Sequence, residues 1–142
     1  MAVDIAEPPR SFADHDEATE SDERPHRLLP ADRFQGVVVH DRFGQKVGLI
    51  EDVAVDEVTG KVAYAILGHR SLLGLGRRFH PVPWSVLHYD PRTGGYVLPL
   101  DRRTLEAAPS YEAKAPGRWD DRSYRDTVHR YYREYGTAPY WA

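Results

Sequence analysis

The sequence predicts a mainly β protein: a small β-barrel or sandwich of five to six strands, with a disordered leader before it and an α-helix after it. Residues 33–101 are dense in Val, Ile, Leu and Tyr and are broken at short intervals by turn residues, which is typical of a small all-β domain. Residues 1–29 are rich in Pro, Asp, Glu and Ser, and their few aliphatic side chains cannot offset the entropy of ordering. Residues 120–136 instead repeat aromatic side chains at helical spacing. With 142 residues the chain is long enough for one domain with a real core.

Five strand segments follow one another in the middle of the chain. The first is closed by a turn in which Gly44 can supply a positive φ, and a second turn at residues 57–60 separates the next two. The fourth contains Pro81 and Pro83, which cannot donate to a strand ladder, so it is expected to lie at an edge or to bend. The predicted segments are Val37–Asp41, Lys46–Asp56, Val62–Gly68, Phe79–Tyr89 and Tyr96–Leu100.

The neighbouring acids Glu51 and Asp52 interrupt the second segment. Its odd positions form the apolar face, and Glu51 alone breaks that face. A bulge here would let Glu51 leave the core face while Val53 resumes it. The alternative is a carboxylate pair for acid/base work, but such pairs face each other across a pocket, whereas adjacent strand residues point to opposite faces. We therefore interpret the two acids as part of the fold.

Four short motifs follow one another through this region. They are G-x-x-V-x-D-x-x-G from Gly36, G-x-I-E-D-V-x-x-D followed by T-G-K-V-x-Y, P-W-x-x-L-x-Y-D over Pro83–Asp90, and a closing L-x-x-A-P at residues 105–109. With this combined spacing, residues 33–111 resemble the PRC-barrel family, named for the cytoplasmic domain of the photosynthetic reaction-centre H subunit. The resemblance implies a small PRC-type β-barrel, and in that family the acid pair and the glycines belong to the fold signature.

The resemblance implies a binding role without a general catalytic centre. The family occurs in the reaction-centre subunit, which packs on other subunits, and in a ribosome-maturation factor, which binds a ribosomal protein beside an RNA-contacting N-terminal domain. This chain has no apolar stretch of about 20 residues that could form a membrane helix, and residues 1–29 cannot be that folded N-terminal domain. It therefore resembles the stand-alone bacterial members of the family.

The loop Gly68–His80 is one candidate contact surface. Leucines at its tip could dock on a partner while arginines supply charge at the rim, or the leucines could fold back on one barrel end with the arginines solvated. A phosphate cradle at Gly74-Leu75-Gly76 is disfavoured, because the sequence continues into a strand rather than a helix. An anion or RNA role for Arg70, Arg77 and Arg78 stays open. The candidate partner-binding residues of this loop are Leu72, Leu73, Leu75, Arg77 and Arg78.

The predicted C-terminal helix is a second candidate. Asp120, Asp121 or Ser123 could cap its start, and it is expected to end near Tyr135 with Gly136 as the stop. One face is apolar and aromatic, and it either packs on the chain's own barrel or contacts a second copy or another partner. Stacking of its tyrosines on single-stranded RNA is weakened by the acids of the same segment. The candidate partner-binding residues are Tyr124, Val128, Tyr131, Tyr132 and Tyr135.

Composition excludes several classes of function. There is no cysteine, so disulfides, thiolate metal sites and thiol nucleophiles are ruled out. The histidines match no compact metal-ligand motif, and no serine lies in a G-x-S-x-G context. The N-terminus lacks the basic and apolar regions of a secretory signal, so we expect a cytoplasmic protein that does not insert in a membrane. Net charge is −3, and because residues 1–30 carry eight acids against three arginines, the remaining residues have a net charge of +2.

Together these observations predict a non-catalytic protein-interaction module that needs no cofactor or metal. It would associate with itself, as a homodimer for instance, or dock on a larger assembly. The alternative is a factor associated with the ribosome or with RNA. The expected organisation is a disordered acidic leader over residues 1–29, a barrel domain over residues 30–111, and a linker with an aromatic-rich helix over residues 112–142.

Overall fold

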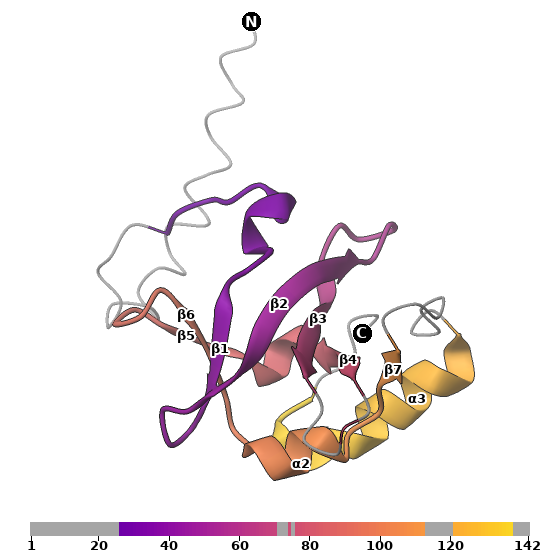
Figure 1. Ribbon diagram of the computed structural model, residues 1–142. Helices are drawn as coiled ribbons and strands as arrows, with labels where there is room; N and C mark the ends of the chain where they lie inside the picture. The colour runs from indigo at the N-terminus through magenta and orange to yellow at the C-terminus, as the bar shows by residue number, and fades with distance from the viewer. Residues whose placement is uncertain (1–25, 71–73, 75, 113–120, 138–142) are drawn as a thin grey trace, which may run out of the picture.

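The computed structural model describes residues 26–70, 74, 76–112 and 121–137, and its framework is one seven-stranded sheet (Figure 1). Five to six strands were expected, on the basis of five strand segments. The difference arises because the predicted fourth segment divides into two strands and because a two-residue strand follows near residue 111. The seven strands are β1 (Val38–Asp41), β2 (Lys46–Val55), β3 (Val62–Arg70), β4 (Arg77–Pro83), β5 (His88–Asp90), β6 (Gly95–Leu98) and β7 (Tyr111–Glu112).

The strand order is β5-β6-β1-β2-β3-β4-β7. Strands β1 to β4 form an antiparallel meander, whereas β6 returns to lie parallel beside β1. The prolines bend the chain as expected: β4 ends at Pro83, and the 3-10 turn η4 (Trp84–Val86) leads directly to β5 at the far end of the order. Among the described residues no ladder joins the two ends of the sheet, so the barrel is curved but not closed by strand pairing.

A bulge lies at Glu51, as the sequence predicted. Ile50 pairs with Leu67 and Asp52 pairs with Ile66, so Glu51 is the extra residue in β2. The expectation that all the odd positions of this strand face the core was wrong. Ile50 and Ala54 are buried, whereas Val55 is 49% exposed. The reason is that each register shift, at Glu51 and near both ends of β2, changes which residues face inward.

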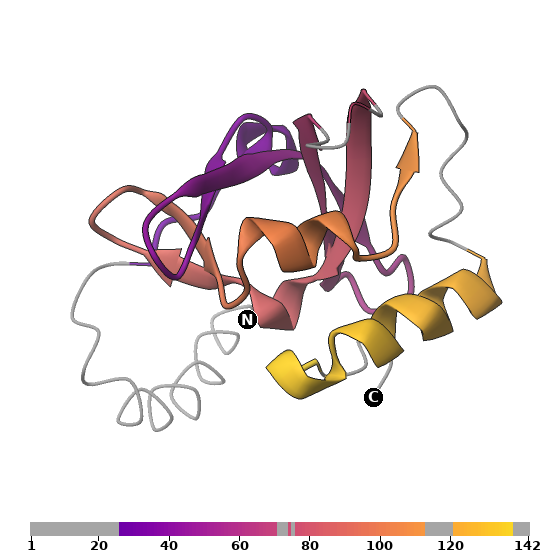
Figure 2. The same cartoon turned by 60° about the horizontal axis from the view of Figure 1, so that its bottom comes forward.

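Two helices cover the sheet on its lower side (Figure 2). Helix α2 (Arg102–Glu106) begins at Asp101, whose Oδ1 accepts a hydrogen bond from the backbone N–H of Thr104 at 2.8 Å. Helix α3 (Arg122–Tyr131) begins after Asp121 and continues as the 3-10 turn η5 (Arg133–Tyr135). Gly136 then adopts a left-handed φ of 92°, so the predicted stop is confirmed. The chain enters β1 through a further 3-10 turn, η3 (Ala31–Phe34).

The core lies between the sheet and these helices. Both faces of β3 are buried, which is why its residues from Ala63 to His69 are apolar or internally paired. Val128 of helix α3 and Tyr132, the C-cap residue that follows the helix, are both 0% exposed and belong to the same core. None of the helices in the described residues is long and apolar enough to cross a membrane.

Candidate functional site: a cationic cleft between β2, β3 and α2

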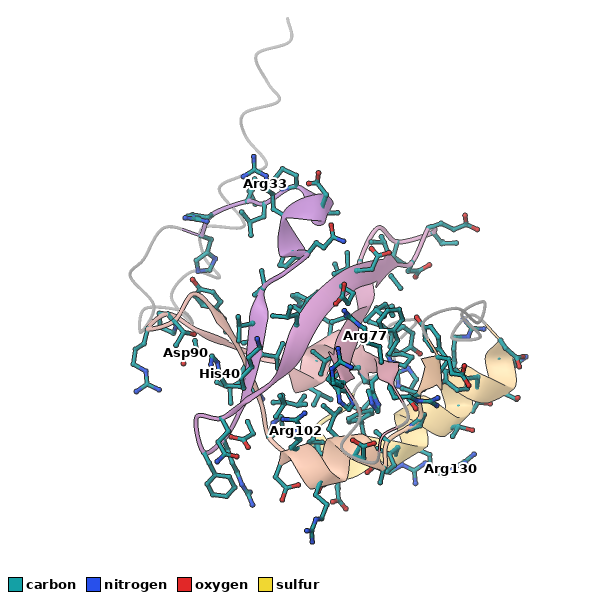
Figure 3. The ribbon with its side chains drawn as sticks, viewed as in Figure 1. Arg33, His40, Arg77, Asp90, Arg102 and Arg130 are labelled. Atoms are coloured by element: carbon teal, nitrogen blue, oxygen red, sulfur yellow. The ribbon has the colours of Figure 1, made fainter. Side chains whose placement is uncertain are left out.

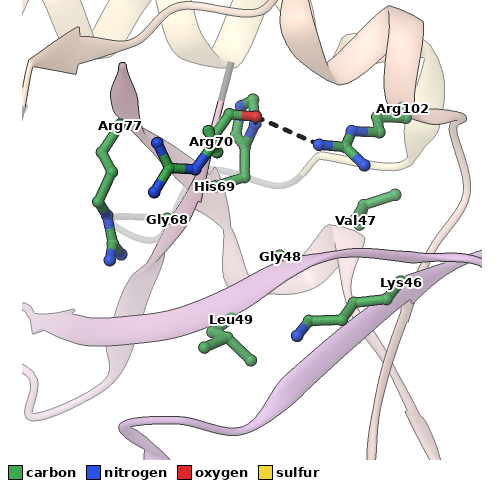
Figure 4. A pocket seen from close by; sticks show the side chains of 9 residues that line it. All are labelled: Lys46, Val47, Gly48, Leu49, Gly68, His69, Arg70, Arg77 and Arg102. Atoms are coloured by element: carbon green, nitrogen blue, oxygen red, sulfur yellow. Dashed lines mark hydrogen bonds between the residues drawn. The ribbon is translucent and has the colours of Figure 1, made fainter. Parts of the chain in front are cut away.

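An open cleft of about 370 Å³ lies where β2, β3, β4 and the start of α2 meet (Figure 4). Its floor is made of Val47, Gly48, Leu49 and Gly68, and positively charged side chains surround it. The cationic residues that line it are Lys46, Arg70, Arg77 and Arg102, and His69 completes the wall.

Each cation comes from the end of a different element. Lys46 begins β2, Arg70 ends β3 and Arg102 begins α2. Arg102 is held in place because its Nη2 donates to the backbone oxygen of Arg70 at 3.2 Å, while its buried Nε has no hydrogen-bond partner among the residues that the structure describes. Within the described part of the chain, no carboxylate lies within ion-pair distance of these three cations. The cleft therefore concentrates positive charge that forms no ion pair with the described carboxylates.

Arg77 differs from these three because it is already paired. Its guanidinium forms an ion pair with Glu51 on β2, and the pair crosses over Gly68 of the intervening strand β3. A Cβ atom built on Gly68 would lie 2.7 Å from Glu51 Cγ, so the missing side chain leaves room for the pair. Asp52 points elsewhere and accepts from the backbone N–H of Val53 at 2.8 Å. The two acids thus have separate local roles and do not face a common pocket.

The other residues predicted for the loop are placed as follows. Arg78 donates from Nε and Nη2 to Ser110 Oγ, at 3.1 and 2.8 Å, and its Nη1 lies 4.0 Å from Glu112. It therefore ties β4 to β7 and does not line the cleft. Leu72, Leu73 and Leu75 lie outside the described residues. Figure 3 shows Arg77 over the central strands and Arg102 beside α2, whereas Arg33 on η3 and Arg130 on α3 lie apart from them.

The aromatic face of α3 packs on the chain's own core, which is one of the two arrangements that the sequence left open. Val128 and Tyr132 are fully buried, so neither side chain is accessible to a partner in this arrangement. Tyr124, Tyr131 and Tyr135 are half-buried against the same core. Tyr131 donates to the backbone oxygen of Thr104 in α2 at 2.6 Å. Partner binding by the exposed parts of these three tyrosines stays a prediction.

The wall residue His69 is paired with a second buried histidine, His80, which does not line the cleft. The rings of His69 and His80 stack with centroids 4.7 Å apart, and their Nε2 atoms are 2.7 Å apart. Burial, followed by the charge of His69, lowers the pKa of His80 to about 3. His80 is therefore neutral at physiological pH. No group of three or more potential metal ligands is found among the residues that the structure describes.

Sequence reasoning missed Lys46, Arg102 and the histidine pair as members of one site. Lys46 and Arg102 are far apart in the chain, and only the parallel return of β6 beside β1 brings α2 next to the start of β2. The sequence did carry a signal for the histidine pair, since His69 is the second residue and His80 the last residue of the Gly68–His80 segment. A hairpin across that loop would have predicted their proximity.

Comparison with known proteins agrees with this architecture. The family model described as PRC-barrel domain matches residues 29–105, which is more than half of the chain. The comparison with curated proteins found no match.

Proposed function

This chain belongs to the PRC-barrel family, and we propose that it acts as a non-catalytic protein-interaction module that recognises acidic side chains of a partner or of a second copy. The contact surface would be the cationic cleft between β2, β3 and α2. The single observation that carries the proposal is the gathering of Lys46, Arg70 and Arg102, from three elements, around one open cleft.

Physical reasons support a carboxylate-bearing partner. The guanidinium of an arginine presents paired N–H groups in the spacing of a carboxylate, and Arg70 and Arg102 each bring one to the cleft. Charged groups at such a surface mainly set the association rate and the choice of partner. The apolar floor of Val47 and Leu49 adds contact area beneath the charges.

The test is an affinity pull-down of the tagged full chain from its native cell lysate, with and without nuclease treatment, with proteins identified by mass spectrometry. The cleft variant is Lys46→Gln/Arg70→Gln/Arg102→Gln. The matched control, Arg33→Gln/Arg122→Gln/Arg130→Gln, removes the same charge from exposed positions outside the cleft. We expect one defined partner, or the chain itself, with the wild type and the control but not with the cleft variant. Equal recovery by the cleft variant would show that the cleft is not the contact surface.

A second candidate is an RNA- or ribosome-associated factor, which the same cluster of cations also favours. Direct RNA binding requires the affinity to fall with added salt and with Arg70, Arg77 and Arg78 changed to Ala. The chain's pI of about 6.1 and the internal ion pair of Arg77 make this the weaker proposal. Recovery of ribosomal proteins that is lost on nuclease treatment would reverse that order.

A further inference from the structure

Carboxylates are concentrated in one short segment near the start of the chain. Residues 14–23, with the sequence DHDEATESDE, contain six acids and no lysine or arginine, and we call them the acidic segment. The segment lies outside the described residues. Its charge is opposite to that of the cleft, where Lys46, Arg70 and Arg102 form no ion pair with the described carboxylates. The chain therefore carries two charge-complementary parts.

The described part of the chain begins beside the strand that forms the cleft floor. The turn η3 packs on β2, and the backbone N–H of Gly36 donates at 2.7 Å to the oxygen of Ile50, which follows Leu49 of the floor. Asp14 precedes Ala31, the first residue of η3, by seventeen positions, which span up to about 56 Å when extended. The ten residues of β2 measure only about 33 Å. The acidic segment is therefore long enough to reach the cleft while η3 stays in place.

We propose that the acidic segment of the same chain occupies the cationic cleft, and that an acidic partner must displace it. This inference rests on the proposed function and adds the regulation of the same site. The tether favours the same chain over a second copy, because the effective concentration of a tethered segment is on the order of 1 mM for short linkers, whatever the protein concentration. The occupied cleft is then an autoinhibited form of the contact surface.

The chemistry of the segment fits an open cleft. Arg102 is already positioned by its hydrogen bond to the backbone oxygen of Arg70, so binding a carboxylate orders fewer side chains. Arg77 keeps its ion pair with Glu51 and is not needed for the contact. The acidic segment has no bulky apolar side chain that would require a deep pocket, since the residues between its acids are His15, Ala18, Thr19 and Ser21.

The first experiment measures, by fluorescence anisotropy, how a peptide with the sequence of residues 14–23 binds to the full chain. The segment variant is Glu17→Gln/Glu20→Gln/Glu23→Gln. The matched control, Asp32→Asn/Glu57→Gln/Asp126→Asn, removes the same charge from exposed positions outside the segment. A tethered competitor weakens the peptide by one plus the ratio of its effective concentration to its own Kd. With values of about 1 mM and about 0.1 mM, the peptide should bind the segment variant about tenfold more tightly than the wild type or the control.

The cleft substitutions separate this proposal from the proposed function. Adding Lys46→Gln/Arg70→Gln/Arg102→Gln to the segment variant should weaken peptide binding. If it does, but the wild type and the segment variant share one Kd, the tethered segment is not the occupant and the acidic contact surface stands. If the added substitutions leave the Kd of the segment variant unchanged, the proposed function fails as well.

A second measurement locates the acidic segment with all its charges intact. Because the sequence has no cysteine, Thr19→Cys provides a single thiol for a nitroxide spin label in the middle of the segment. In nitrogen-15-labelled protein, the spin label should broaden the NMR signals of the Leu49 and Gly68 amides. A mixture of nitrogen-15-labelled wild type with spin-labelled chain of natural abundance should show no broadening. Equal broadening in the mixture would assign the segment to a second copy, and unbroadened cleft signals in both samples would show that the segment stays away from the cleft. Either result overturns the proposal.

Discussion

At the scale of single residues, two strand glycines of the cleft floor differ in what surrounds them. A Cβ on Gly48 would lie 2.6 Å from the backbone oxygen of Gly68, whereas a Cβ on Gly68 would meet the side chains of Glu51 and Arg77. Backbone can move less than the side chains of an ion pair. Substitution by alanine should therefore reduce the free energy of unfolding by different amounts at the two positions.

We predict that Gly48→Ala lowers the free energy of unfolding by about 1–3 kcal/mol, as overpacking of a core usually does. Gly68→Ala should lower the free energy of unfolding by a smaller amount, because the side chains of Glu51 and Arg77 can rotate away from the new methyl group. Urea denaturation of the two variants checks this. A Gly68→Ala variant that is less stable than Gly48→Ala would mean that the ion pair over β3 is rigid.

At the scale of elements, the buried side chain of Tyr132 anchors the end of helix α3 in the core, although its hydroxyl group is buried unfavourably. The ring of Tyr132 is 0% exposed, and its hydroxyl is buried without a hydrogen-bond partner among the described residues. Burial raises the pKa of this hydroxyl, so it stays neutral. The ring therefore stabilises the docked helix, and the hydroxyl opposes it.

We predict that Tyr132→Phe is neutral or raises the free energy of unfolding by up to about 1–3 kcal/mol, since it removes an unsatisfied buried hydroxyl. Tyr132→Ala should instead lower it by about 3–5 kcal/mol through the cavity it leaves. Thermal unfolding followed by circular dichroism compares the two. A clear loss of stability in Tyr132→Phe would indicate that a water molecule satisfies the hydroxyl.

The elements also show what a single sequence can predict. The turns at Gly44 and Gly60, the bulge at Glu51 and the end of the C-terminal helix were predicted, because each depends on residues within one short segment. Strand β7 was not predicted, since two residues carry no periodicity. The cleft could not be predicted either, because its cations come from three distant elements and only tertiary structure brings them together.

At the scale of the whole molecule, the buried histidine links stability to pH. In the unfolded chain His80 takes up a proton near pH 6.5, but in the folded chain only near pH 3. Between these values the unfolded state binds more protons. The free energy of unfolding is therefore not reduced by this histidine above pH 6.5, and it decreases steadily as the pH falls from 6.5 toward 3.

We predict that the free energy of unfolding falls between pH 7 and 4.5 by up to about 1.4 kcal/mol per pH unit from this group. Urea titrations of the wild type and His80→Gln measure it, with His88→Gln as the control. Asp90 and Asp101, whose pKa values are lowered by hydrogen bonds to Arg92 and Thr104, act below this range. An unchanged slope in His80→Gln would contradict the assignment.

The parallel pairing of β1 with β6 affects how the chain folds during synthesis. Val39 of β1 pairs with Tyr96 of β6, so β6 leaves the ribosome only after β2 to β5 have been made. Until then one edge of the meander has free backbone N–H and C=O groups, which is the kind of edge at which chains aggregate. The β1 edge is thus the part of this fold that most needs protection in a nascent chain, and slower translation after residue 98 would not shorten that exposure.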